Sequence, residues 1–429
     1  MKNIIVIAYL IHHSKGSEFA VAWDYITHMS KSNKLTVLYG SCDGFHKIGN
    51  TIEMEDYLAN NPLQNVRFIP VKPSFMCMNY DYSVWGIHRF YKEYALWHRD
   101  VRAAVLDLLE HNNYDLIHYL GPIGYREPGF LYGLNIPYIW GPIGGMAFTD
   151  FRIFKGANEI KGGLQLLIKK IFNEIQLRFS PRVKDAMSKA DLVIGCTKRT
   201  TQIIKKIYNV PNTRLLYFTQ NCLQNEYPLE YEKFERDIID VVWVGRIDAG
   251  KSLITALRAL AGCKYKDKYR LHVIGLKGSQ YNKCVEYIKN NSISELVQFY
   301  GKIPREGVLE IIKNAHLHII TSLIDVNPTI MWECMSYCVP TISMANNGIE
   351  DIVNDNTGFL VKLASYNKVV NEFSNTLDSI ALNPSILRIK AENIAEDRRR
   401  FAWVNRVKKI NKQYEIAIQN YQNGRKKEN

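Results

Sequence analysis

Short apolar runs alternate with longer amphipathic segments along the whole chain. Residues 4–10, 35–39, 66–71, 116–120, 137–140 and 192–196 form these runs in the first half, and residues 241–244, 271–274, 297–300, 317–320 and 341–344 form them in the second. Strands that alternate with helix-length patterns predict parallel sheets with helices on both faces. Two such series predict an α/β protein with two Rossmann-like domains.

A charged, aperiodic segment at residues 225–237, which contains Pro228, separates the two series. We therefore predict an N-terminal domain over residues 1–225 and a C-terminal domain over residues 226–395. From about residue 396, Phe401, Val404, Val407 and Ile410 recur at helical spacing, which predicts an amphipathic helix and a polar tail over residues 396–429. A chain of 429 residues is long enough for two large domains.

Composition narrows the classes of partner. Lys and Arg exceed Asp and Glu by 55 − 42 = 13, which favours nucleotides, nucleic acid or an anionic membrane surface. No zinc-finger or RNA-recognition signature is present, so we predict no nucleic-acid partner. The eight cysteines include no Cys-x-x-Cys pair, which predicts reduced thiols and neither a zinc site nor a disulfide framework. No apolar run is long enough to span a bilayer, so any work at a membrane is expected from its surface.

The first candidate site follows the strand run at 241–244. This run breaks at Gly245, and the turn before the next helix carries Arg246 and Lys251. Glycine lets a ligand approach the backbone closely, and a helix amino terminus favours anions. Two cations at the carboxyl end of a strand suit a diphosphate. Solvated cations near an ordinary helix start are the alternative interpretation.

The second candidate site follows the strand run at 317–320. Asp325 lies in a polar turn, Pro328 offers the fixed φ that suits the first position of a helix, and Glu333 falls inside this otherwise apolar helix. A carboxylate in apolar surroundings is costly unless a partner satisfies it. A helix cap and a solvated Glu are the alternative. Both candidate sites follow strands of the same half, and open parallel sheets bind ligands at the carboxyl ends of their strands.

These elements, with a turn at 346–353 and a turn into a strand at 356–361, resemble the donor-binding half of a retaining GT-B glycosyltransferase of glycosyltransferase family 4 (group 1). The family pattern is a V-G-R strand with a lysine beyond it, a carboxylate and a Glu separated by seven residues, then G-G-x-x-E-x-V and T-G-x-L-V elements. The chain matches from residue 244 to 361 with three departures. Asp325 stands where Glu is usual, Asn347-Gly348 replaces the glycine pair, and Asp351 replaces a Glu.

The resemblance implies a GT-B fold, in which two Rossmann-like domains face each other across a cleft and the C-terminal helix returns to the N-terminal domain. It implies a UDP-, GDP- or other nucleoside diphosphate sugar as donor, and no metal or other cofactor. Arg246 and Lys251 would grip the diphosphate, Glu333 would accept hydrogen bonds from the ribose, and Asp325 would meet the sugar hydroxyls. The implied donor-binding set is Gly245, Arg246, Lys251, Asp325, Pro328, Thr329 and Glu333.

The first half matches the family more loosely. Gly16-Ser17-Glu18 resembles a glycine-bearing loop of the cleft, although an ordinary strand-to-helix turn is the alternative. His118 ends a strand run where the family often has a histidine facing the transferred sugar, which adds it to Asp325, Arg246 and Lys251 as a catalytic candidate. A core histidine bonded to backbone is the alternative. The glycine pair Gly144-Gly145, in a W-G-P-x-G-G loop, resembles a subgroup that assembles bacterial surface polysaccharides.

Two segments bear on the acceptor. Residues 75–97 are dense in aromatic side chains, which suits sugar stacking or a lipid interface, with core packing as the alternative. Residues 151–189 mix apolar and basic side chains, which predicts a membrane-binding amphipathic helix, with a solvated cationic face as the alternative.

The expected function is retaining hexosyl transfer to a lipid-linked oligosaccharide in bacterial O-antigen or capsule biosynthesis. The enzyme is expected to be cytoplasmic and peripheral on the inner membrane, bound to its cytoplasmic face through the basic amphipathic segment near residues 151–189. A catalytically degenerate nucleotide-binding or scaffold protein of a polysaccharide assembly complex is the alternative.

Overall fold

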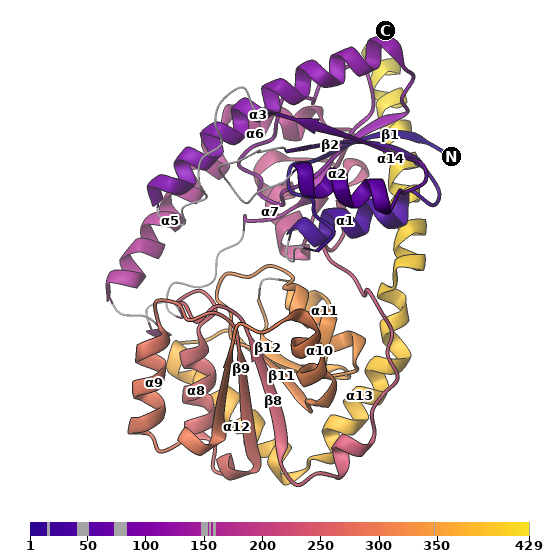
Figure 1. The fold of residues 1–429 in the computed structure, drawn as a ribbon. Coiled ribbons are helices and arrows are strands. Elements are labelled where there is room, and N and C mark those ends of the chain that lie inside the picture. The colour runs from indigo at the N-terminus through magenta and orange to yellow at the C-terminus, as the bar shows by residue number, and fades with distance from the viewer. Residues whose placement is uncertain are drawn as a thin grey trace. The chain divides into compact units, whose positions relative to one another are not determined.

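The computed structural model describes residues 1–14, 18–40, 51–72, 84–146, 153, 156–157, 160–346 and 348–428. The chain divides into two compact units, each built on its own parallel sheet (Figure 1). Unit 1 comprises Met1–Met146, Asn173–Gln220 and Val404–Asn429, and unit 2 comprises Ala147–Phe172 and Asn221–Trp403. Within the described residues, 153, 156–157 and 160–172 group with the second sheet and unit 2 continues to Trp403, whereas the sequence predicted bounds after residues 225 and 395.

Unit 1 contains a seven-stranded parallel sheet in the order β3-β2-β1-β4-β5-β6-β7. Its strands are β1 (Asn3–Ala8), β2 (Lys34–Gly40), β3 (Val66–Val71), β4 (Leu116–Gly121), β5 (Tyr138–Ile143), β6 (Leu192–Gly195) and β7 (Leu215–Tyr217). Its helices are α1 (Glu18–Met29), α2 (Thr51–Asn60), α3 (Val84–His111), α6 (Pro181–Lys189), α7 (Lys198–Tyr208) and α14 (Trp403–Glu428), and α5 (Ile160–Phe179) begins in unit 2 and ends in unit 1. Strand order reverses at β1, as in a doubly wound sheet.

Unit 2 contains a six-stranded parallel sheet in the order β10-β9-β8-β11-β12-β13. Its strands are β8 (Ile239–Val244), β9 (Tyr269–Ile274), β10 (Val297–Gly301), β11 (Leu317–Ile320), β12 (Thr341–Met344) and β13 (Gly358–Val361). Figure 1 shows helices on both sides of this sheet. One side carries α8 (Leu253–Gly262), α9 (Tyr281–Asn290) and α12 (Tyr366–Leu382), and the other carries α10 (Arg305–Asn314), α11 (Thr329–Ser336) and α13 (Ser385–Asp397).

Short 3-10 helices complete the connections, at Asn212–Arg214, Glu232–Glu235, Lys266–Lys268, Ser294–Leu296, Ile349–Asp351 and Arg398–Phe401. The prediction of two Rossmann-like parallel sheets is confirmed, and each predicted apolar run coincides with a strand. The inner strands β1, β4, β5, β6, β8, β11 and β12 bury nearly every residue because helices cover both faces, which is why they appear in the sequence as continuous apolar runs. The edge strands β3, β7, β10 and β13 are only partly buried.

The C-terminal helix α14 packs on unit 1, as the resemblance implied. Tyr414 is fully buried, and the Nδ2 atom of Asn33 donates a hydrogen bond of 2.9 Å to Oδ1 of Asn411 on this helix. The apolar face of α14 therefore packs on the N-terminal unit, although the stretch Asn221–Trp403 of unit 2 intervenes in the sequence.

The aromatic segment at 75–97 lies only partly within the described residues, because residues 75–83 fall outside them. In the remainder, Tyr94 and Trp97 belong to the core of unit 1, and the indole Nε1 of Trp97 donates to the carbonyl of Val71 at 3.0 Å. Tyr94 and Trp97 therefore follow the core-packing alternative. No helix among the described ranges is long and apolar enough to cross a membrane.

Candidate functional site

The loops after β8 and β11 meet at the carboxyl edge of the sheet of unit 2. These strands are neighbours and run parallel, so their ends lie side by side. Lys251 lies in the turn after β8, and its Nζ forms an ion pair with Oδ2 of Asp325 in the loop after β11. The two side chains are 30% and 23% exposed, so the pair is accessible from solvent. The structure thus brings together two residues that the sequence places 74 positions apart.

Asp248 organises the cations of the β8 turn. Its Oδ1 accepts a hydrogen bond of 2.9 Å from the backbone N–H of Lys251, and its Oδ2 accepts one of 2.8 Å from Nε of Arg246. The neighbouring loop is tied to the same turn, because Oγ of Ser322 donates to the carbonyl of Gly250 at 3.2 Å. The two cations are therefore held on a turn that is braced before any ligand binds. Sequence reasoning did not assign Asp248.

Two glycines allow the backbone segments after β8 and β9 to approach each other closely at this edge. The N–H of Gly245 donates to the carbonyl of Ile274 at 2.9 Å, and a Cβ at Gly275 would lie 2.0 Å from the carbonyl oxygen of Gly245. A Cβ at Gly245 would lie 3.3 Å from the side chain of Lys251. Gly245 was predicted to admit a ligand; in the structure its missing side chain makes room for the stem of Lys251.

Helix α11 begins one residue after Pro328, which the sequence predicted as its first position. Pro328, with φ of −61°, directly precedes Thr329, the first helical residue. The carbonyl of Asn327 accepts a hydrogen bond of 3.0 Å from Nδ2 of Asn221, which anchors this entry to the segment that opens unit 2. Pro328 makes no side-chain cap hydrogen bond, so the first backbone N–H groups of α11 have no capping acceptor on the loop that carries Asp325. This geometry suits an anionic group at the helix start.

Glu333 is 17% exposed, and Arg305 of α10 supplies its partner. Nη2 of Arg305 lies 2.9 Å from Oε1 of Glu333. Burial raises the pKa of the Glu333 carboxyl, and the Arg305 guanidinium acts in the opposite direction. The sequence predicted that something must satisfy this carboxylate but did not identify the partner. The signal was present, since Arg305 follows Pro304 at a helix start, where a cation is unfavourable.

His318 of β11 also lines this site. A small pocket at the edge is lined by Lys251, His318, Thr321, Asp325 and Pro328, among others. The Nδ1 atom of His318 lies 3.2 Å from Oγ1 of Thr341, and burial together with the nearby Lys251 charge lowers the pKa of His318 to about 3. The imidazole is therefore neutral at physiological pH and adds no charge to the site.

His118 is a core residue of unit 1. Its Nδ1 lies 2.8 Å from the hydroxyl of Tyr25, its Nε2 lies 2.7 Å from the carbonyl of Gly141, and burial lowers its pKa to about 4. The expected role of His118 toward a transferred sugar stays a prediction. Helices α1 and α14 cover the side of β4 on which His118 lies, so the alternative of a core histidine bonded to backbone describes it.

Glu18 and the glycine pair converge on one residue of unit 1. The N–H of Ile123 donates to Oε1 of Glu18 at 3.3 Å, and the carbonyl of Ile123 accepts from the N–H of Gly144 at 2.7 Å. Burial raises the pKa of Glu18 to about 7. Gly145 has φ of +75°, in the left-handed region that favours glycine. Gly16 and Ser17, predicted for the same loop, lie outside the described residues.

A repeated tetrapeptide underlies this convergence and was missed in the sequence. Gly-Pro-Ile-Gly occurs at residues 121–124 and again at 141–144, at the carboxyl ends of the neighbouring strands β4 and β5. A β-bridge joins Gly124 to Gly144. The repeat therefore extends the pairing of the two strands past the sheet edge and positions the loop that carries Gly145.

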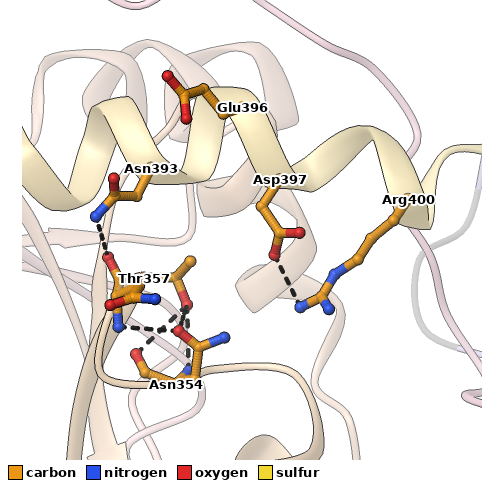
Figure 2. A pocket seen from close by; sticks show the side chains of 7 residues that line it. Asn354, Thr357, Asn393, Glu396, Asp397 and Arg400 are labelled. Carbon is orange, nitrogen blue, oxygen red and sulfur yellow. Dashed lines mark hydrogen bonds and ion pairs between the residues drawn. The ribbon is translucent and has the colours of Figure 1, made fainter.

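A larger polar pocket of unit 2 contains none of the predicted residues (Figure 2). Its volume is about 460 Å³, and it lies between α13 and the turn before β13. Its polar groups largely satisfy one another, since Nδ2 of Asn393 donates to the carbonyl of Asn356 at 3.0 Å and Arg400 pairs with Asp397 at 2.8 Å. This turn precedes β13, so the pocket lies at the amino edge of the sheet, opposite Lys251 and Asp325.

No group of three or more His, Cys, Asp or Glu side chains that suits a metal ion occurs among the described residues. Lys251 and Arg246 are instead the cationic groups at the carboxyl edge of β8. Metal independence stays a prediction.

A protein family matches the part of the chain that carries this candidate site. Residues 230–401 match the family described as glycosyl transferases group 1. Gly245, Arg246, Lys251, Asp325, Pro328, Thr329 and Glu333 all lie inside the match. Among curated proteins, the lipopolysaccharide 1,6-galactosyltransferase of Salmonella typhimurium is 36% identical over 78 residues, which are 18% of this chain and 21% of that relative. The matched segment thus spans about a fifth of the relative.

Solved structures share the fold over nearly the whole chain. The lipopolysaccharide outer core galactosyltransferase WaaB, in its apo form, has a TM-score of 0.60 at 14% identity and covers 100% of both chains. HepE of Anabaena, in complex with UDP and glucose, has a TM-score of 0.59 at 13% identity and covers 96% of this chain and 99% of its own. The protein therefore has the fold of GT-B glycosyltransferases, as predicted.

Proposed function

We propose that this protein is a retaining glycosyltransferase that moves a hexose from a nucleoside diphosphate sugar to a lipid-linked oligosaccharide in bacterial surface polysaccharide biosynthesis. The ion pair of Lys251 with Asp325, at the carboxyl edge of a glycosyltransferase group 1 domain, carries the proposal. The relative that acts in lipopolysaccharide synthesis and the UDP complex of a neighbour support the substrate classes. Unit 1 would supply the acceptor side, with Glu18, Gly144 and Gly145 as its candidate residues.

In the proposed reaction, the bond between the sugar C1 and the donor phosphate oxygen breaks, and a bond from C1 to the acceptor oxygen forms on the same face. Lys251 and Arg246 would bind the diphosphate and stabilise the negative charge that grows as it leaves. A phosphate oxygen of the leaving group would take the acceptor proton. Asp325 would exchange its contact with Lys251 for hydroxyls of the transferred sugar, and Glu333 would accept from the ribose.

The first test uses purified protein, a panel of nucleotide sugars and a lipid-linked acceptor, with nucleoside diphosphate release as the readout. We expect release with one donor, and we expect Glu333→Ala to raise the donor KM by about tenfold or more, because a charge-assisted hydrogen bond contributes roughly 1.5–3 kcal/mol. Glu286→Ala, an exposed carboxylate of α9, is the matched control and should leave the KM unchanged.

Two outcomes contradict the proposal in different ways. Unchanged kinetics of Glu333→Ala would show that the donor site is wrongly assigned. Nucleotide binding without transfer, across all donors and acceptors, would instead favour the catalytically degenerate scaffold, for which Asp325 in place of the usual Glu is the motivating feature.

Membrane association is a further part of the proposal and rests on α5. Large apolar side chains are exposed at helical spacing along this helix, opposite its buried residues Asn173 and Leu177. The exposed side chains are Leu164, Ile168, Ile171, Phe172, Ile175 and Phe179. Arg178 lies on the same helix, and the chain carries a net charge of +13. An apolar stripe on a cationic protein suits the anionic cytoplasmic face of the inner membrane, where a lipid-linked acceptor would reside.

Sedimentation with vesicles tests this part. We expect wild type to bind vesicles that contain anionic phosphatidylglycerol, and Phe172→Ser/Phe179→Ser to weaken binding by at least tenfold, because each buried phenyl contributes roughly 1.5–3 kcal/mol. Leu382→Ser/Ile389→Ser, which removes two exposed apolar side chains of unit 2, is the control. Equal binding of both variants would remove α5 from the proposal. A concentration-dependent dimer that only the first variant loses would assign the stripe to pairing between copies.

A further inference from the structure

Arg305 occupies a position that its own helix does not favour. It is the first residue of α10, after Pro304, and the positive end of the helix dipole disfavours a cation there. The guanidinium is 55% exposed, yet it reaches across to α11, where Nη2 lies 2.9 Å from Oε1 of Glu333. The placement of Arg305 is therefore explained by the carboxylate on the neighbouring helix.

The two helices hold this contact through a shared apolar cluster. Ile312 of α10 and Cys334 of α11 are fully buried and pack in the same cluster as Val242 of β8. Cys334 directly follows Glu333, so the cluster fixes the backbone from which the carboxylate extends. The distance between α10 and α11 is thus set by packing on the sheet and does not depend on the exposed ion pair itself.

The ion pair with Arg305 involves one of the two oxygens of the Glu333 carboxylate. Oε1 of Glu333 contacts Arg305, whereas Oε2 has no hydrogen-bond partner within the described part of the chain. In its surroundings, burial raises the pKa of Glu333 and Arg305 lowers it. The other titratable groups that interact with Glu333 are Cys334 and Tyr337 at the end of α11, and Glu310 of α10 acts on Tyr337. Among these groups, Arg305 is the one that stabilises the charged carboxylate.

We propose that Arg305 is the positioning residue of the nucleotide site: it holds Glu333 ionised and turned so that Oε2 accepts hydrogen bonds from the ribose hydroxyls of the donor. This inference rests on the proposed function, in which Glu333 binds ribose. The inference gives Arg305 a role in selecting ribonucleotides, which it exerts through Glu333. Arg305 itself is not a catalytic residue. A charged acceptor forms stronger hydrogen bonds to hydroxyls than a protonated one.

Calorimetric titration of full-length protein at pH 8 and pH 5.5 tests the proposal. The probes are UDP, GDP and ADP, followed by the 2′,3′-dideoxy form of whichever binds best. At pH 8 we expect Arg305→Gln to weaken binding of the ribonucleotide by about tenfold and to leave the dideoxy form unchanged. At pH 5.5 the loss of affinity in Arg305→Gln should be larger. In this variant burial raises the pKa of Glu333 with no cation to oppose it, so more of the carboxyl is protonated at the lower pH. Arg305→Lys should recover most of the affinity, since it retains the charge.

Arg388→Gln is the control, because Arg388 forms an exposed ion pair with Glu392 at 3.1 Å in the same unit. If Arg305→Gln binds the ribonucleotide as wild type does at both pH values, the inference fails while the proposed function stands. If it weakens the dideoxy form equally, Arg305 acts on the phosphates or the base, and the inference also fails. If wild type binds none of the three nucleotides, the proposed function itself is overturned.

Discussion

Replacing Lys251 with Met is expected to lower kcat by about 10²- to 10³-fold, with a much smaller change in the donor KM. Negative charge grows on the diphosphate as the glycosidic bond breaks, so a cation at the leaving group stabilises the transition state more than the ground state. Met retains the apolar stem that occupies the space beside Gly245, so the local packing is preserved. Steady-state kinetics of nucleoside diphosphate release measure the effect.

Two further variants separate the charge from its surroundings. Lys264→Met removes an exposed lysine of the same unit and should leave kcat unchanged. Lys251→Met/Asp325→Asn removes both members of the ion pair, and therefore also the repulsion that an unpaired Asp325 would exert on a diphosphate. If this double variant recovers full activity, Lys251 serves only to neutralise Asp325, and its assignment to the diphosphate fails.

Replacing Gly275 with Ala is expected to destabilise unit 2 by more than about 3 kcal/mol and to abolish nucleotide binding. Gly275 has φ of +141°, and an added Cβ would lie 2.0 Å from the carbonyl oxygen of Gly245. Neither strand end can move without displacing the turn that carries Arg246 and Lys251. Strain and overpacking of this kind belong to the large effects of single substitutions. Thermal unfolding and calorimetric titration with UDP measure the two consequences.

Gly301→Ala is the matched control for backbone strain. Gly301 also has a positive φ, of +67°, but no atom lies within 4 Å of its added Cβ. Its carbonyl accepts a hydrogen bond of 2.8 Å from the N–H of Gly275, so both positions belong to the same part of the sheet. We expect a loss of about 1 kcal/mol and retained nucleotide binding. Equal losses in the two variants would show that φ, and not the close approach, decides the effect.

The carboxyl edge of the sheet of unit 2, where the candidate donor-binding residues lie, illustrates how much a pattern of residues can predict. Gly245, Lys251, Asp325 and Pro328 all follow strands that the apolar runs at 241–244 and 317–320 identify. Because neighbouring parallel strands end at the same edge, predicting the strands was enough to predict that these side chains gather. The ion pair of Lys251 with Asp325 realises that expectation. Strand β7, with three residues, was missed because so short a run carries no periodicity.

For Glu333 and His118, the sequence pattern alone did not decide between a functional and a structural role. Each is a polar residue in an apolar run, and both functional and structural interpretations were open for each. Glu333 lies beside Arg305, and its side chain is 17% exposed. His118 lies beside the hydroxyls of Tyr25 and of Tyr414, which is 296 positions away, and is fully enclosed. The difference lies in the partners, and those partners come from other elements of the fold.

The sequence by itself thus determined the two parallel sheets, the loops that carry the candidate donor residues and the helix start at Pro328. These features depend on local properties, which are the apolar character of buried strands and the fixed φ of proline. Only the tertiary structure decided that Arg305 reaches Glu333 and that His118 is buried. Such contacts join segments far apart in the chain, and the packing of helices on the sheets sets their distances.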